Sequence, residues 1–117
     1  MSLNLEKYQV LANLLEQVKY NTTVTPVNAP ELRKSVAVLQ QLFRQEIVPL
    51  PDGDARLVSY RTEISKQLRL LELDVMFLQG ARQASTVSER LKTISDRLTT
   101  LMQYCDAILQ PPPEEET

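Results

Sequence analysis

The chain has 117 residues, 43% of them hydrophobic, which suits one globular domain with its own core and excludes a disordered chain. Its net charge is −2, and without the Glu114–Glu116 run twelve acids face thirteen bases. A nearly neutral body disfavours nucleic-acid binding, which requires a basic patch. Only two glycines occur, while Leu, Gln, Glu and Arg are abundant, so the composition predicts an all-α fold.

The first helix is expected from about residue 3 to residue 20, where apolar positions recur at i, i+3, i+4 and i+7. The second should begin after Asn28, a natural N-cap, with Pro30 in its first turn. Pro49 cannot continue it, so it should end near residue 47. The apolar face of the second helix consists of Leu32, Val36, Leu39, Phe43 and Ile47.

The third helix should run from about residue 54 to residue 79 or 83, because Gly80 can end a helix or merely weaken it. Asp52, Gly53 and Asp54 form the turn before it, and either aspartate could cap the helix. Thr86 and Glu89 have capping-box spacing and are expected to open the fourth helix. The triple proline ends it, and the tail over residues 111–117 is predicted to be disordered. The unbroken apolar face of the fourth helix is Val87, Leu91, Ile94, Leu98, Leu101, Cys105 and Ile108.

Four helices with mostly short connections predict an antiparallel four-helix bundle that occupies residues 1–110 as a single domain. At 1.5 Å per residue the third helix is roughly 40 Å long and the first only roughly 27 Å. The third and fourth helices should therefore form a long hairpin that the first two cannot cover fully. We expect the uncovered part to be available to a partner.

The third helix carries two apolar stripes on different faces. One stripe should pack against the fourth helix and contains Leu57, Ile64, Leu68, Leu71, Val75 and Leu78. The second contains Leu70, Leu73, Met76 and Phe77. It either packs against the first or second helix or forms a dimer or partner surface, since an exposed apolar strip is unusual on a monomer. The sequence leaves both alternatives open.

Polar residues interrupt the heptad pattern of this hairpin at a few positions. Arg61 and Arg82 fall at a positions near the helix ends, from which we expect them to extend into solvent, although polar a positions can also set register or oligomer state. Asp74 and Arg97 both fall at g positions. They are predicted to form a salt bridge across the hairpin.

Catalytic chemistry is poorly supported by the residues present. The chain has no histidine, which is the commonest general base and metal ligand, and its two isolated glycines cannot form a phosphate-binding loop. The only cysteine, Cys105, lies on an apolar helix face and is expected to be a buried small hydrophobe and not a nucleophile. We predict a non-enzymatic protein without cofactor or metal.

The sequence does not indicate a membrane or an oxidising compartment. The first residues lack the basic region and apolar core of a secretory signal. No apolar run approaches the roughly 20 residues that span a bilayer, and a single cysteine forms no internal disulfide. We therefore expect a cytoplasmic protein.

A family resemblance is carried by segments of the third and fourth helices, namely Tyr60–Ile64, Leu68–Gln79, Ala81–Gln83, Arg90–Leu91, Asp96–Leu98 and Tyr104–Cys105. Together they resemble the cyanobacterial heterocyst frequency control protein PatD family. The resemblance implies a small all-helical regulator of heterocyst differentiation that contacts the cell-division protein FtsZ. It carries no catalytic residues. Because the resembling segment coincides with the second stripe, we infer Leu70, Leu73, Met76 and Phe77 to be the partner-binding residues.

Two alternatives from the residues remain beside this interpretation. The bundle is equally suited to be a structural or chaperone-like subunit that binds an amphipathic helix of a client protein. The same stripe would also serve a homodimer. The expected partner is therefore a protein, either FtsZ, a client, or a second copy of the chain, and not a nucleic acid or a membrane.

Overall fold

The computed structural model describes residues 3–24 and 26–110 of the chain. Within these residues every regular element is helical, as the composition predicted. The predicted disordered tail, residues 111–117, lies outside the described residues. The elements are α1 (Leu3–Asn21), α2 (Ala29–Leu42), the π-helix η1 (Phe43–Ile47), α3 (Ala55–Gly80) and α4 (Ala84–Leu109).

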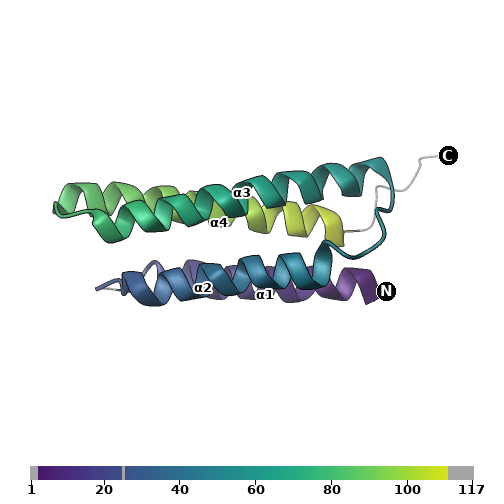
Figure 1. Ribbon diagram of the computed structural model, residues 1–117, viewed down its shortest axis with the longest axis horizontal. Helices are drawn as coiled ribbons and strands as arrows, with labels where there is room; N and C mark the ends of the chain where they lie inside the picture. Colours follow the sequence, from purple (N-terminus) through teal and green to yellow (C-terminus); the bar gives the residue numbers. More distant parts are fainter. Residues whose placement is uncertain (1–2, 25, 111–117) are drawn as a thin grey trace.

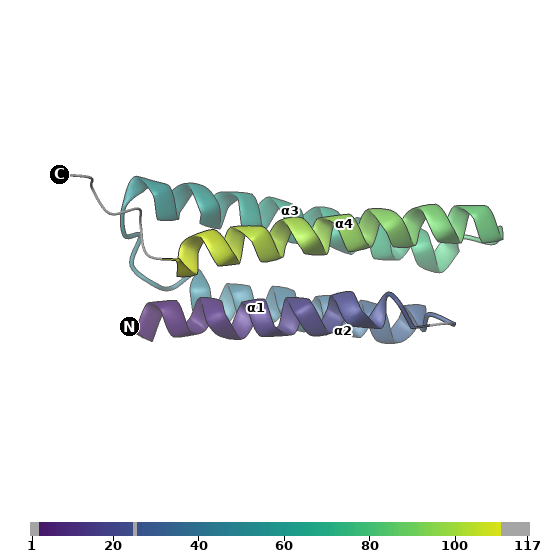
Figure 2. The same cartoon turned by 180° about the vertical axis from the view of Figure 1, so that it is seen from behind.

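The four long helices lie in two layers, with α1 and α2 in one and α3 and α4 in the other (Figure 1). Within and between the layers, α4 packs against α1 and α3, while α2 packs against α3 and α1. The molecule is elongated, with extents of 56 × 30 × 20 Å. The turn between α3 and α4 extends beyond the loop between α1 and α2, as the view from behind also shows (Figure 2). The far end of the α3/α4 pair is therefore not covered by the other layer.

The core is built from the apolar stripes that periodicity assigned to each helix. In α1 these are Tyr8, Leu11, Leu15 and Val18, and in α2 and η1 they are Leu32, Val36, Leu39, Phe43 and Ile47. The other layer contributes Ile64, Leu68, Leu71, Val75 and Leu78 from α3, and Ile94, Leu98, Leu101, Cys105 and Ile108 from α4. Of the predicted core positions, Leu57, Val87 and Leu91 are only partly buried and pack against the edge of this cluster.

Helix starts follow the predicted caps at two of three places. The side chains of Asn28 and Asp54 accept hydrogen bonds from backbone N–H groups three residues on, at 3.0 and 2.9 Å. The predicted capping box of Thr86 and Glu89 is wrong, because α4 already begins at Ala84. The earlier start leaves a turn of only three residues between α3 and α4.

The π-helical turn η1 was not predicted, and the spacing of the core residues explains it. The apolar positions of α2 follow each other at intervals of 4, 3, 4 and 4, so Ile47 comes one residue later than a 4-3 repeat would place it. An i→i+5 turn holds one more residue than an α turn, and Val48 N–H donates to the Phe43 carbonyl at 2.9 Å. The wider turn keeps both Phe43 and Ile47 buried.

Candidate protein-interaction surface

The second stripe of α3 lies outside the core. Leu73, Met76 and Phe77 are 42%, 48% and 54% exposed, and Leu70 is partly buried. Neither α1 nor α2 covers these side chains, which excludes the alternative that the stripe is part of the core. We call Leu70, Leu73, Met76 and Phe77 the α3 stripe. Their role in partner binding stays a prediction.

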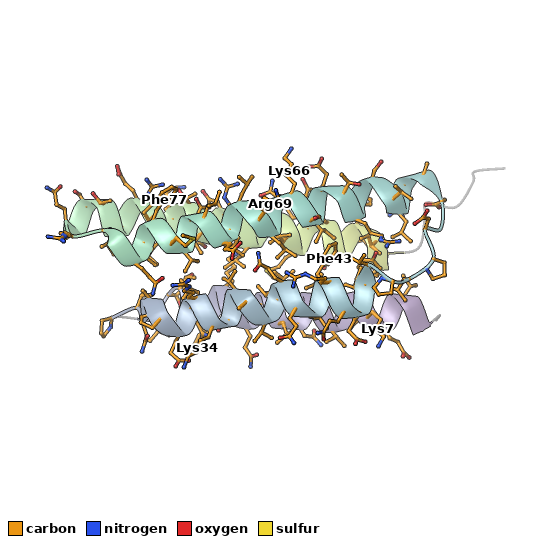
Figure 3. All side chains as sticks on the ribbon, in the orientation of Figure 1. Lys7, Lys34, Phe43, Lys66, Arg69 and Phe77 are labelled. Atoms are coloured by element: carbon orange, nitrogen blue, oxygen red, sulfur yellow. The ribbon has the colours of Figure 1, made fainter. Side chains whose placement is uncertain are left out.

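The end of the α3 stripe is supported by α4. The guanidinium of Arg90 lies 4.8 Å from the centre of the Phe77 ring, which is a cation–π contact. Phe77 lies on the α3/α4 layer, far from the labelled Lys7 and Lys34 of the other layer (Figure 3). The ring is thus held from one side by a long cationic side chain and remains more than half exposed.

An open groove lies beside η1 and continues the same face of α3 toward its N-terminal half. Its volume is about 490 Å³, and a smaller depression of about 200 Å³ shares Phe43, Val48, Ser65 and Arg69 with it. We call the two together the η1 groove. Val58, Thr62, Arg69, Leu73 and Met76 fall within an arc of roughly 60° on α3 at 100° per residue. The η1 groove is therefore continuous with the part of the α3 stripe that Leu73 and Met76 form, while Leu70 and Phe77 lie roughly 40–60° further around the helix.

The η1 groove is rich in cations. Arg44, Arg61, Lys66 and Arg69 line it, against the single carboxylate of Asp52. Asp52 lies 3.7 Å from Arg61, and Lys66 lies 3.7 Å from Glu63 on its own helix. In the described part of the chain, Arg44 and Arg69 have no ion pair and no hydrogen bond to their side chains.

Arg61 has a structural role that differs from the prediction. Instead of extending into solvent, its side chain is only 13% exposed and donates to the carbonyls of Val48, Pro51 and Leu50 at 2.7, 3.1 and 3.3 Å. Carbonyls at the C-terminal end of a helix have no intrahelical partner, and a nearby arginine satisfies them. Arg82, the other arginine at an a position, is exposed as expected.

The predicted salt bridge across the hairpin is confirmed. Arg97 of α4 donates through Nε to Asp74 of α3, and through a second guanidinium nitrogen to Gln67 at 3.2 Å. The Asp74 side chain is 8% exposed and that of Arg97 is 27% exposed. The pair is thus more buried than a surface ion pair, and it links α3 to α4 on the side that faces away from the η1 groove.

Cys105 is buried, as predicted, and burial raises the pKa of its thiol to about 12. A thiol that stays protonated is a poor nucleophile. The hydroxyl of Tyr8 is also buried and has no hydrogen-bond partner among the residues that the structure describes, and desolvation raises its pKa to about 12. Within residues 3–24 and 26–110, no three His, Cys, Asp or Glu side chains are placed to hold a metal ion.

The η1 groove was missed by sequence reasoning, because it forms between η1 and α3, and helical periodicity does not reveal how the loop over residues 48–54 places these two elements against each other. Arg44 and Arg69 look like ordinary surface arginines in helical periodicity. The one available signal was Arg61, whose apolar heptad position marks it as unusual. The heptad position of Arg61 drew attention to a residue that lines the groove, but it did not reveal that the guanidinium donates to backbone carbonyls.

The remaining observations concern membrane crossing and the similarity of the sequence to known proteins. None of the helices over the described residues combines the length and apolar character that crossing a bilayer requires. No curated protein and no solved structure matches the sequence. The family model of the CRR41 C-terminal domain, however, matches residues 5–105, which include α2, η1 and α3 and most of α1 and α4. The chain therefore belongs to the CRR41 C-terminal domain family.

Proposed function

We propose that this chain is a non-enzymatic module that binds another protein through the exposed face of α3. The observation that carries the proposal is the α3 stripe, where Leu73, Met76 and Phe77 stand 42–54% exposed on one helix. Exposed apolar side chains that gather on one rigid element are typical of protein-binding surfaces. Within the proposal, the two layers form an antiparallel four-helix bundle whose long α3/α4 hairpin presents this face.

The energy available from the α3 stripe limits what it does alone. Full burial of one such side chain contributes roughly 1.5–3 kcal/mol, so covering three half-exposed ones contributes about 3 kcal/mol. A micromolar complex requires about 8 kcal/mol. The stripe therefore anchors a partner, and other contacts on the same face must supply the remainder.

The resemblance of α3 and α4 to the PatD family supports a more specific proposal. In it, the module regulates how often cells differentiate into heterocysts, and its partner is FtsZ. This cytoplasmic role requires no catalytic group.

A chaperone-like role is the second candidate, and the uncovered end of the α3/α4 hairpin favours it. A straight helical pair that extends beyond the other layer (Figures 1 and 2) offers a surface on which an amphipathic helix of a client protein can lie. Client binding would use the same α3 stripe. The two roles differ in the partner and not in the surface.

The test is a double variant with Leu73→Glu and Phe77→Glu. We expect it to lose co-sedimentation with FtsZ filaments while its circular dichroism stays that of the wild type, because both side chains lie outside the core. The matched control carries Val10→Glu and Val38→Glu, which place the same charges on half-exposed valines of α1 and α2.

Three outcomes separate the candidates. If the wild type does not bind FtsZ but does retain a labelled amphipathic helix that the double variant releases, the chaperone-like role is supported. Loss of a dimer in the double variant, measured by light scattering, would assign the stripe to self-association. If both pairs of substitutions leave all binding unchanged, the surface assignment is wrong.

A further inference from the structure

The η1 groove combines an apolar base with unpaired cations, and this combination indicates what kind of ligand it accepts. Phe43 is buried at the base, and the side chains of Val48 and Val58 at its edges are 49% and 40% exposed. A volume of about 490 Å³ lies within the range of sites that hold a ligand group. The apolar base suits a hydrocarbon side chain and gives no hydrogen bonds to a bare inorganic anion.

Within the part of the chain that the structure describes, two of the four cations around the η1 groove have acceptors nearby and the other two do not. Arg61 is occupied by backbone carbonyls and Asp52, and Lys66 is near Glu63. Arg44 and Arg69 face the groove from η1 and α3 and have no acceptor among the described residues. The carboxylate of Glu72, three residues after Arg69 on α3, accepts a hydrogen bond from Gln40 at 3.3 Å. Two guanidinium groups on opposite sides of the groove are therefore free to bind carboxylates, which they match in a bidentate geometry.

We propose that the η1 groove binds an acidic segment of the protein partner, with carboxylates on Arg44 and Arg69 and an apolar side chain against Phe43. This inference rests on the proposed function, because it names the chemistry of the same partner. The η1 groove would then supply the additional binding energy that the α3 stripe alone does not provide.

The continuity of the face sets the size of the partner segment. Val58 and Met76 are 18 residues apart on α3, which corresponds to roughly 27 Å. A partner helix of roughly 18 residues covers this length. It would place its acidic end in the η1 groove and its apolar end on the α3 stripe. A helix with charges and apolar groups divided in this way is the ligand that fits the whole face.

The test uses the full-length chain and three peptides that carry fluorescein on the N-terminal nitrogen, EELFEEL-amide, QQLFQQL-amide and KKLFKKL-amide. Fluorescence polarisation at 50 mM salt should rank their affinities in this order, since the peptides differ only in charge. Raising the salt to 300 mM should remove most of the preference for the acidic peptide, because exposed charge pairs are screened.

A double variant with Arg44→Glu and Arg69→Glu should bind the acidic peptide at least about tenfold more weakly than the wild type. The matched control has Lys34→Glu and Lys92→Glu, which change the net charge equally on exposed residues outside the groove and should leave affinity unchanged. Arg44→Lys with Arg69→Lys should bind with intermediate affinity, because lysine keeps the charge but not the bidentate geometry.

The inference is overturned if the acidic and neutral peptides bind equally, if none of the peptides binds, or if the Arg44→Glu and Arg69→Glu variant binds like the wild type. It is also overturned if the acidic peptide binds only after residues 111–117 are removed, which would assign the groove to Glu114–Glu116 of the chain itself. A dimer that this variant abolishes would assign the groove to a second copy. In each case, loss of partner binding in the Leu73→Glu and Phe77→Glu variant would leave the proposed function standing.

Discussion

Asp74 and Arg97 form an ion pair, and we predict that removing the arginine destabilises the fold more than removing the carboxylate does. The Asp74 side chain is 8% exposed, whereas that of Arg97 is 27% exposed and has a long stem. After Arg97→Met, the Asp74 carboxylate remains between α3 and α4 without its cation. After Asp74→Asn, the arginine can turn into water and keep its hydration.

The expected free energies follow from this asymmetry. Removing one partner of a buried pair costs roughly 3–5 kcal/mol, and the partial exposure of Arg97 selects the lower end, about 3 kcal/mol for Arg97→Met. Asp74→Asn loses a charged hydrogen bond but buries no charge, so we expect about 1 kcal/mol. The double variant should cost about 2 kcal/mol, because the isolated carboxylate is then absent.

Urea denaturation followed by circular dichroism at 222 nm measures all three values, and the slope of the transition should stay constant. The midpoint of thermal unfolding of Arg97→Met should fall by about 10 °C. Lys92→Met is the control, since it breaks an exposed i,i+4 pair with Asp96 whose contribution is about 0.5 kcal/mol or less. Equal costs for Arg97→Met and Asp74→Asn would refute the reasoning.

Four further predictions concern the buried hydroxyl of Tyr8, the pH dependence of stability, the two glycines and Arg61. Tyr8→Phe removes a buried hydroxyl without a hydrogen-bond partner and should raise stability at pH 7 by about 1 kcal/mol in urea denaturation. Burial raises the pKa of Tyr8 and of Cys105 from 10.0 and 9.0, respectively, to about 12. Because both groups lose their protons more readily in the unfolded chain, the free energy of unfolding should be at its full value below pH 9 and fall as the pH rises toward 12. The fall should be less steep in Tyr8→Phe. Gly53→Ala should cost about 1 kcal/mol or more, because φ is +73° there, whereas Gly80→Ala meets no neighbour and should stabilise α3 by about 0.5 kcal/mol. Arg61→Met should cost about 2 kcal/mol and increase amide exchange around Val48, while an unchanged exchange rate would show that the carbonyls do not need Arg61.

The elements that sequence reasoning predicted well are those in which one physical effect decides the outcome. Helical periodicity placed the core residues of all four helices, because burial of an apolar stripe dominates helix packing. Local capping chemistry correctly located the starts of α2 and α3 at Asn28 and Asp54. The capping box at Thr86 failed because α4 begins at Ala84, so Thr86 lies inside the first turn and cannot be the N-cap.

The candidate site was only half accessible from sequence. The α3 stripe follows from periodicity, although spacing alone does not determine which of the two apolar faces of α3 is turned toward α1 and α2. The η1 groove depends on the path of the loop after Ile47 and on the side of α3 that faces it. Arg61 shows the difficulty, since its carbonyl partners lie 10–13 residues earlier in the chain.

The π-helical turn has a consequence for insertions and deletions in this chain. The π-helical turn η1 contains one residue more than an α-helical turn. Deleting the exposed Arg44 or Gln45 would therefore reduce the interval between Phe43 and Ile47 from four residues to three, which is the interval that continues the 4-3 repeat of a regular α-helix. Such a shortened chain should keep its core and replace η1 with ordinary α-helix. A deletion in the middle of α2 would instead rotate every later side chain by about 100° out of the core. Residues 43–47 are thus the one place in the second helix where the chain can lose a residue without losing its fold.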